Sequence, residues 1–339
     1  MNTTRTQATS KKTATPARRI RALAIAAAIA GVAAPAITAT PARASGDGYR
    51  LNSIAHYASV AGVSGLVAPN FGHGAVIAER TGQIHHLPQA GYGGDFVRRW
   101  MSSPPVAVAA YYSPDDGVSH AMVALRDRTL HEVYFSPTYG PFDYKVATFS
   151  KSIVGIGAYY TPDRNRHTIV ALRDGTIHDV YFLPGQAVHD VVIAQLRGVV
   201  ALSGFYTSDD GFGHAIVALR DRTVHELYFR NGSVGNALLH TYPTRITAVG
   251  GFSYQTWVWP NGNPVQVEER DVVVKLADGT IHEIWFNPRF GIGEGKLNID
   301  PSIAAPTSSV AGFDDGGGFP AYVFGTKDGF AWLYQFVVG

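Results

Sequence analysis

The chain carries SHAMVALRDRTLHEVYF at residues 119–135, RHTIVALRDGTIHDVYF at 166–182 and GHAIVALRDRTVHELYF at 213–229. These near copies start 47 residues apart. More diverged copies occupy 73–89, 270–286 and 320–336. A period of this length, made of strand-like patterns, is typical of a β-propeller and not of a helical solenoid.

Each repeat predicts four strands. A Gly-rich apolar strand such as IVGIGAYY at 153–160 comes first, and a hairpin with a tight turn such as RDGT at 173–176 follows. A looser outer strand, such as the one at 191–196, completes the unit. Gly and Ala on the first strand suit a crowded centre where the blades taper together. Asp-Gly dipeptides in the turn supply the positive φ that a two-residue hairpin needs, and they occur at 174–175, 278–279 and 328–329.

The repeats predict six blades. We expect the first strands near 59–67, 106–112, 153–160, 200–206, 246–253 and 308–313. The last repeat ends without an outer strand, whereas Tyr49–His56 precedes the first repeat as a spare strand. We therefore predict an all-β fold, a single six-bladed β-propeller over 45–339, in which Tyr49–His56 closes the ring on the last blade. Closure hides the edges that an open sheet exposes.

Residues 1–44 have the pattern of a signal peptide. A basic region precedes an apolar run at 22–37, and small residues follow at Ala42 and Ala44. We predict cleavage before Ser45 and a secreted, extracellular protein. A membrane anchor is the alternative, but this run is short for a membrane span and no later segment is long enough.

The charge of the mature chain argues against nucleic acid as a partner. The whole chain has 28 Lys and Arg against 26 Asp and Glu, and residues 1–44 hold seven of the basic residues and no acid. Their removal leaves 21 basic against 26 acidic residues, a net charge of −5. A net-negative chain without basic runs is a poor nucleic-acid binder. The absence of Cys excludes disulfides, thiolate chemistry and Cys-ligated metal.

Histidines recur in two columns of the repeat. One column forms dipeptides with an acid on the third strand: His131-Glu132, His178-Asp179, His225-Glu226 and His282-Glu283. Neighbours on a strand point to opposite faces, so such a pair cannot act together as acid and base, and the helical spacing of HExxH is absent. The other column lies twelve residues before three of these acids, where a tight hairpin brings the two positions alongside: His120, His167 and His214.

Two interpretations of these columns are open. The His and the acid form a structural hydrogen bond, because buried polar groups need partners. Alternatively, each blade boundary holds a shallow pocket in which they bind sugar hydroxyls while an aromatic side chain, two residues beyond the acid, stacks on the ring. The candidate ligand-binding residues are His120, Glu132, Tyr134, His167, Asp179, Tyr181, His214, Glu226, Tyr228, Glu283 and Trp285.

A polar residue opening one strand, an Asp-Gly turn, and an acid plus an aromatic on the next strand resemble the blades of six-bladed fucose-binding lectins. In that family an Arg on the second strand and a Glu on the third hold one sugar, and Trp or Tyr packs on its apolar face. The resemblance assigns the acid role to Glu132, Asp179, Glu226 and Glu283. The family's Arg position holds His120, His167 and His214 here, and Arg270 or Asp271 in the fifth repeat.

The fifth repeat contains an insertion. His225 and His282 lie 57 residues apart, ten more than the period, and the extra residues fall around 254–270. Trp257 and Trp259 alternate with Val258, so on an extended segment both indoles share one face and are candidates for stacking on a sugar or a peptide side chain. The alternative is an extended hairpin whose rings only cover the blade.

Three Asp pairs fall on turns after first strands: Asp115-Asp116, Asp209-Asp210 and Asp314-Asp315. Oxygen-rich turns can bind Ca²⁺, but Asp is also an ordinary turn former. Apart from this calcium hypothesis we predict no cofactor and no metal site. Neither a nucleophile elbow nor a phosphate-binding loop is present, so no catalytic residue is predicted.

The leading functional hypothesis is a secreted, lectin-like propeller that binds glycans at several weak sites between blades. The alternatives are a secreted hydrolase or lyase with one site at the mouth of the central channel, and a protein-interaction scaffold. Multivalent binding predicts functional residues that recur in most blades. An enzyme predicts unique polar residues in one or two loops. The recurrence of the candidates favours a protein without enzymatic activity.

Overall fold

The computed structural model describes residues 49–68, 72–87, 97–136, 140–230, 232–258, 264–287, 291–314 and 319–336. The predicted signal peptide and its cleavage site lie outside these residues. No helix among them is long and apolar enough to cross a membrane.

Six four-stranded sheets form from the described residues, which confirms the all-β propeller. Blade 1 contains β2 (Val60–Ala68), β3 (Gly72–Glu79), β4 (Gln83–Leu87) and β5 (Val97–Trp100). Blade 2 contains β6 (Pro105–Ser113), β7 (Val118–Leu125), β8 (Thr129–Ser136) and β9 (Gly140–Thr148). Blade 3 contains β10 (Ile153–Tyr160), β11 (Arg166–Leu172), β12 (Thr176–Phe182) and β13 (His189–Gln195).

Blades 4 to 6 follow the same order. Blade 4 contains β14 (Val199–Tyr206), β15 (Gly213–Leu219), β16 (Thr223–Arg230) and β17 (Ser233–Thr241). Blade 5 contains β18 (Ile246–Val258), β19 (Val265–Leu276), β20 (Ile281–Asn287) and β21 (Gly291–Lys296). Blade 6 contains β22 (Thr307–Asp314), β23 (Pro320–Thr326), β24 (Phe330–Phe336) and β1 (Tyr49–His56). A short helix, α1 (Pro301–Ala304), precedes blade 6.

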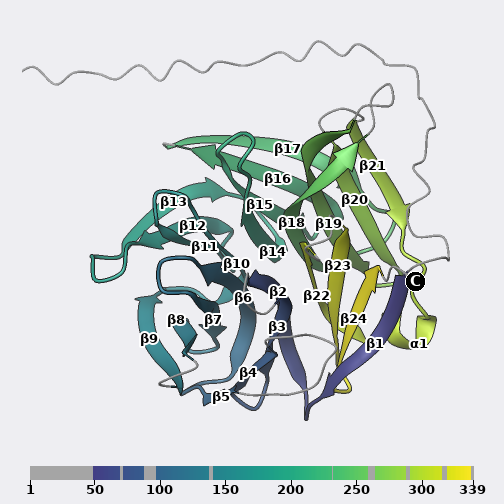
Figure 1. The fold of residues 1–339 in the computed structure, drawn as a ribbon. Helices are drawn as coiled ribbons and strands as arrows, with labels where there is room; N and C mark the ends of the chain where they lie inside the picture. Colours follow the sequence, from purple (N-terminus) through teal and green to yellow (C-terminus); the bar gives the residue numbers. More distant parts are fainter. Residues whose placement is uncertain are drawn as a thin grey trace, which may run out of the picture. The chain divides into compact units, whose positions relative to one another are not determined.

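The first strands line the centre, and each lies beside the first strand of the next blade, including β22 beside β2 (Figure 1). Small residues allow this approach. At Gly157 an added Cβ would collide with the backbone of Gly204 in the neighbouring blade. The Gly and Ala residues of the first strand therefore permit the tapering that the sequence predicts.

The ring closes as predicted. Strand β1 pairs antiparallel with β24, with Tyr49 opposite Phe336 and His56 opposite Phe330. Figure 1 shows β1, from the start of the described chain, beside β24 at its end. The outer strand of blade 6 therefore comes from the opposite end of the chain.

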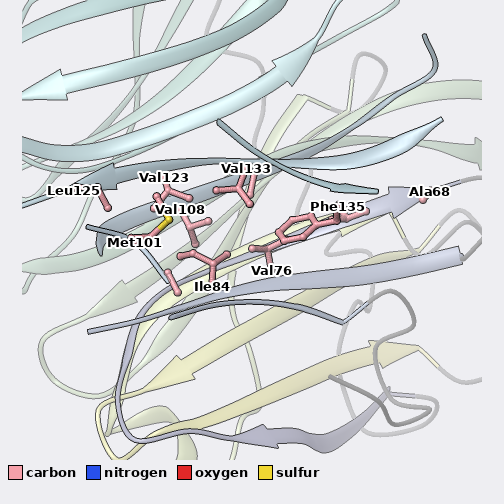
Figure 2. Close-up of a cluster of buried hydrophobic side chains, with 12 residues drawn as sticks. Ala68, Val76, Ile84, Met101, Val108, Val123, Leu125, Val133 and Phe135 are labelled. Atoms are coloured by element: carbon pink, nitrogen blue, oxygen red, sulfur yellow. The ribbon is translucent and has the colours of Figure 1, made fainter. Parts of the chain in front are cut away.

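The hydrophobic core lies between adjacent blades. Figure 2 shows one such cluster, in which Val76 and Ile84 of blade 1 lie with Val108, Val123 and Val133 of blade 2. Side chains alternate along each strand, so every inner strand contributes to the core on both of its faces. The packing of apolar β-branched residues between blades provides the burial that a disulfide-free domain of this size needs.

The hairpin turns have the predicted backbone. Gly175, Gly279 and Gly329 have φ of +91°, +95° and +98°. Arg128 and Arg222 hold the same position in blades 2 and 4 with φ of +75° and +78°, a conformation that non-glycine residues rarely adopt. These turns, between second and third strands, all lie at one end of the blades, which we call the hairpin end. The turns between first and second strands, such as 161–165, lie at the opposite end, which we call the pocket end.

Candidate ligand-binding pockets between the blades

The second-strand histidines pair with the third-strand acids, as the twelve-residue spacing predicts. Nδ1 of His120 lies 3.0 Å from Oε1 of Glu132, and the equivalent distance from His214 to Glu226 is 2.9 Å. In blade 3, Nδ1 of His167 lies 3.0 Å from Oδ1 of Asp179. These His–acid pairs lie at the pocket end of their blades.

The third-strand histidines lie on the opposite face and contact their own outer strand. Nδ1 of His131 lies 2.7 Å from Asp143, and Nε2 lies 3.1 Å from the Thr129 hydroxyl. Thr129 in turn donates to Asp127 in the hairpin turn over 2.6 Å. Blade 5 repeats this chain of contacts, with His282 2.6 Å from Glu294. The two members of each His-acid dipeptide thus have separate partners, as expected of neighbours that point to opposite faces of a strand.

At the boundary of blades 2 and 3, an arginine engages the acid. Arg166 of blade 3 donates to Glu132 over 3.0 Å and to Asp116 over 2.7 Å. The Tyr111 hydroxyl also donates to Glu132, over 2.6 Å. A cavity of about 510 Å³ adjoins this network, with Tyr134 among its lining residues. Glu132 itself is 3% exposed, and its Oε1 accepts the hydrogen bonds from both Arg166 and Tyr111.

At the boundary of blades 4 and 5, an arginine fills the equivalent space. Nη1 of Arg270 lies 3.4 Å from Glu226 and 3.7 Å from Asp210. Its guanidinium lies 4.2 Å from the centre of the Phe286 ring, an arrangement typical of a cation–π contact. The remaining cavity measures only about 10 Å³. Tyr228, which holds the position of Tyr181 in blade 4, is 40% exposed and is not among the residues that line this cavity.

The candidates in blade 5 are enclosed. Glu283 is 3% exposed and accepts a hydrogen bond from the Tyr322 hydroxyl of blade 6. Trp285 is 8% exposed and packs over Gly293 of its own outer strand. Side chains of the protein thus already contact the acid and the aromatic ring that the resemblance assigns to a sugar.

The boundary of blades 3 and 4 is open, because Gly213 occupies the position of Arg166 and Arg270. The cavity here measures about 690 Å³, larger than those at the boundaries on either side, and His167 and Asp179 line it. Their side chains are 15% and 11% exposed, whereas His120 and His214 are each 1% exposed. The acids do not follow this order, since the side chains of Glu132 and Glu226 are 4% and 14% exposed. Glycine at the position of the two arginines therefore goes with a larger cavity and a more exposed histidine.

Aromatic rings form much of this cavity. Tyr181 is stacked between His167 and His189, with ring centres 5.3 and 4.9 Å apart. Tyr159 and Phe229 supply further walls. A Cβ at Gly213 would clash with the Tyr159 hydroxyl and lie 2.7 Å from the Phe229 ring. Glycine at this position thus lets both rings approach as well as leaving Asp179 unpaired with arginine.

The insertion in the fifth repeat extends a hairpin, as the alternative interpretation predicts. Strands β18 and β19 pair as far as Val258 opposite Val265. Trp257 is 52% exposed, and Trp259 lies outside the described residues. Glu268 of this hairpin accepts hydrogen bonds from the backbone and hydroxyl of Ser208, over 2.9 and 2.7 Å. The hairpin therefore braces the 207–212 turn, which contributes to the wall of the blade 3–4 cavity.

The Asp-rich turns contact protein groups. Asp115 pairs with Arg164 over 2.8 Å, and Asp116 lies 3.0 Å from His120. Asp210 accepts from the Thr207 hydroxyl over 2.5 Å. Among the described residues, no group of three or more His, Asp or Glu side chains is arranged to hold a metal ion, and Asp315 lies outside them. Calcium binding stays a hypothesis from the sequence.

The central channel is mostly lined by small and apolar residues of the first strands, with a volume of about 540 Å³. Tyr112, Tyr160 and Tyr206, from three successive blades, line it towards the pocket end. The His–acid pairs lie outside this channel lining, at the blade boundaries. The repeated candidates therefore do not converge on one central site.

His214→Ala is expected to lower the free energy of unfolding by about 1–3 kcal/mol, the usual cost of removing a partner from buried polar groups. His214 is fully buried and contacts Glu226 and, over 2.8 Å, the Thr207 hydroxyl. Urea denaturation measures the change, with the exposed His189→Ala as the control that should change stability by less than about 0.5 kcal/mol. Wild-type stability in His214→Ala would contradict a structural role.

Comparisons with known proteins show the fold. The BP39L lectin from Burkholderia pseudomallei superimposes with a TM-score of 0.56 at 10% identity, over 82% of this chain and 81% of that one. AofleA from Arthrobotrys oligospora gives 0.56 at 12% identity, over 86% and 87%. BBS1N in complex with ARL6DN gives 0.51 at 13% identity, over 85% and 96%. No family model matches the chain, and no curated protein matches it in sequence. The resemblance to the fucose-binding lectins is thus one of architecture.

Proposed function

We propose that this protein is a secreted carbohydrate-binding propeller whose principal site is the cavity between blades 3 and 4. One observation carries the proposal: Asp179 and His167 line an aromatic-walled cavity that lacks the arginine present at the boundaries on either side. The architecture shared with the BP39L lectin supports the same class of function.

The cavity has the groups that a sugar ring needs. Asp179 accepts hydrogen bonds from hydroxyl groups, and a His167 ring whose Nδ1 donates to Asp179 presents Nε2 as a further acceptor. Tyr181 also lines the cavity, and because His167 and His189 lie against the two faces of its ring and hold it, binding costs little side-chain entropy. Hydrogen-bond acceptors beside aromatic walls match a saccharide, which carries both hydroxyl groups and apolar C–H surface.

The two neighbouring boundaries are less suited to binding a sugar than the boundary of blades 3 and 4. The blade 2–3 cavity has enough volume, but Glu132 is 3% exposed and Arg166, His120 and Tyr111 already contact its Oε1. The cavity between blades 4 and 5 has little space for a ligand. The repeats predict several weak sites. We expect instead one principal site between blades 3 and 4 and one weaker site between blades 2 and 3.

Asp179→Asn is expected to weaken glycan binding by about 10- to 100-fold, because it removes a charge-assisted hydrogen bond worth about 1.5–3 kcal/mol. Tyr181→Ala should have a similar effect, because it removes part of the cavity wall and the ring that supports His167. A glycan array identifies the ligand, and isothermal titration calorimetry measures its affinity for each variant. Tyr228→Ala is the matched control, because this tyrosine stands beside the closed boundary.

Three results would count against the proposal. An array without glycan binding would contradict it. Equal affinity of Asp179→Asn and the wild type would also contradict it. A loss of binding in Tyr228→Ala but not in Tyr181→Ala would place the site at another boundary.

A further inference from the structure

Blade 1 departs from the repeat at the hairpin end of the propeller. The last residue of the second strand is a buried leucine in blades 2 to 5: Leu125, Leu172, Leu219 and Leu276. In blade 1 this residue is Glu79, and it is still only 5% exposed. A carboxylate therefore occupies a position that blades 2 to 5 use for the apolar core and at which blade 6 buries the uncharged Thr326.

Side chains of the same blade hold this carboxylate. The Thr81 hydroxyl donates to Oε2 of Glu79 over 2.7 Å, and Nε2 of His85 lies 3.0 Å from Oε1. His85 is 1% exposed, and its ring centre lies 4.2 Å from that of Tyr57. Burying a charge costs free energy that leucine does not, so these contacts offset a penalty that the other blades avoid. A residue that breaks a local rule in this way is expected at a functional site.

Two further residues near the Glu79–His85 pair differ from their equivalents in blades 2 and 4. Gln83 and Trp100 lie opposite each other on β4 and β5. Threonines occupy both of these positions in blades 2 and 4, for example Thr129 opposite Thr148. Trp100 is 61% exposed, a large apolar surface to leave in water. The differences at positions 79, 83 and 100 therefore cluster at one place.

These residues share a cavity of about 610 Å³ with Ala55–Ala58, the segment made of the end of the closing strand and the two residues after it. That segment is fixed by a hydrogen bond from Tyr57 N to the Gly329 carbonyl over 2.9 Å. His56 is exposed, with Nε2 3.3 Å from the Asp328 carbonyl. The cavity lies at the hairpin end, whereas the blade 3–4 cavity lies at the pocket end, and the two share no residue.

We infer that this cavity is a second, separate binding site for a neutral glycosyl unit. Trp100 provides the stacking platform, and Gln83 and His56 provide hydrogen bonds for hydroxyl groups. The Glu79–His85 pair fixes the floor of the cavity. Because protein groups engage both carboxylate oxygens of Glu79, the site suits a neutral polyhydroxylated ring better than a cation. The inference does not rest on the blade 3–4 site.

The binding site is tested by replacing residues of blade 1 with those that blades 2 and 4 carry at the same positions. The double variant Glu79→Leu/Trp100→Thr carries the residues of blades 2 and 4. Leucine returns to a core position, whereas the buried His85 loses its contact with Glu79, so circular dichroism and thermal melting first establish that the variant is folded. Full-length wild type, this double variant and Asp179→Asn are compared on one array of neutral glycans. We expect a set of glycans to lose at least 10-fold in affinity for the double variant while Asp179→Asn retains them. Trp100→Phe, which keeps an aromatic platform, should preserve most of this binding.

Three results would contradict a glycan site at the hairpin end. A double variant that binds every glycan as the wild type does would overturn it, as would a wild type that binds no glycan. Loss of binding in Trp100→Phe equal to that in the double variant would also overturn the platform role. If Asp179→Asn binds all glycans normally while the double variant fails, the hairpin-end site stands and the blade 3–4 site falls.

Discussion

Deletion of residues 49–56 is expected to destabilise the protein by more than about 4 kcal/mol, beyond the range of ordinary single substitutions. Strand β1 pairs with β24 from Tyr49 to His56 and supplies the outer strand of blade 6. Ile54 and Ala55 also pack against the cluster that contains Val323 and Leu333. The deletion removes this ladder and this packing together, and it leaves β24 with an open edge. Chemical denaturation measures the loss, and light scattering measures the association expected of the exposed edge.

A circular permutant provides the control. Because Tyr49 lies opposite Phe336, residues 49–58 can follow the C-terminus through a short linker and re-form the same strand. This permutant, which begins near Ser59, should recover most of the lost stability. A deletion variant that melts like the wild type would show that β1 does not close the ring.

Arg166→Met is expected to cost about 3–5 kcal/mol, because it leaves buried carboxylate charge without its cationic partner. Glu132 is 3% exposed and Arg166 is 7% exposed, and the same guanidinium also binds Asp116. Asp174→Asn, in an exposed turn on the same blade, is a control with a much smaller expected effect. Urea denaturation distinguishes a buried network from a surface ion pair, which is worth about 0–1 kcal/mol.

The same network predicts a stability optimum in mildly acidic solution. Burial opposes ionisation of Asp116, but hydrogen bonding to His120 and the charge of Arg166 outweigh it and lower the pKa of Asp116 to about 2. Burial also opposes ionisation of Glu132, yet His120 and Arg166 lower the pKa of Glu132. Burial disfavours protonated His120, but its contacts with Asp116 and Glu132 raise the pKa of His120.

The direction of each pH effect follows from these shifts. The carboxylates stabilise the fold above their unfolded pKa of about 4, and this contribution is lost as the pH falls towards 2. Protonated His120 stabilises the fold below about pH 6.5, and this contribution is lost as the pH rises through its raised pKa. Denaturation between pH 2 and 9 should therefore show highest stability at about pH 4–6.5. His120→Gln should flatten the alkaline decline, and an unchanged decline would show that another group causes it.

The strands were predictable because the repeat combines a fixed period with turn residues. Asp-Gly at 174–175 sets the hairpin, and the first strand predicted at 153–160 is observed at Ile153–Tyr160. Closure by Tyr49–His56 was predictable from counting, since one strand was missing at one end of the chain and one was spare at the other. The twelve-residue spacing also located each His–acid pair correctly, because register within a hairpin follows from its turn.

The differences in volume between the pockets were not predicted, because they depend on side chains that extend from the next blade. The informative signal was present in the repeats, whose opening residue is Ser119, Arg166, Gly213 and Arg270 in blades 2 to 5. A pattern along one strand does not show that this residue contacts the acid of the preceding blade. Glu79 was missed for a related reason, because only alignment with the buried leucines of other blades shows that its position belongs to the core.

A crystal structure of the protein with the glycan identified by the array tests the central claim most directly. We expect a sugar ring between blades 3 and 4, in contact with Tyr181 and with a hydroxyl on the Asp179 carboxylate. Glycan bound only in the central channel, or a cavity at Gly213 that stays without sugar at saturating concentration, would contradict it.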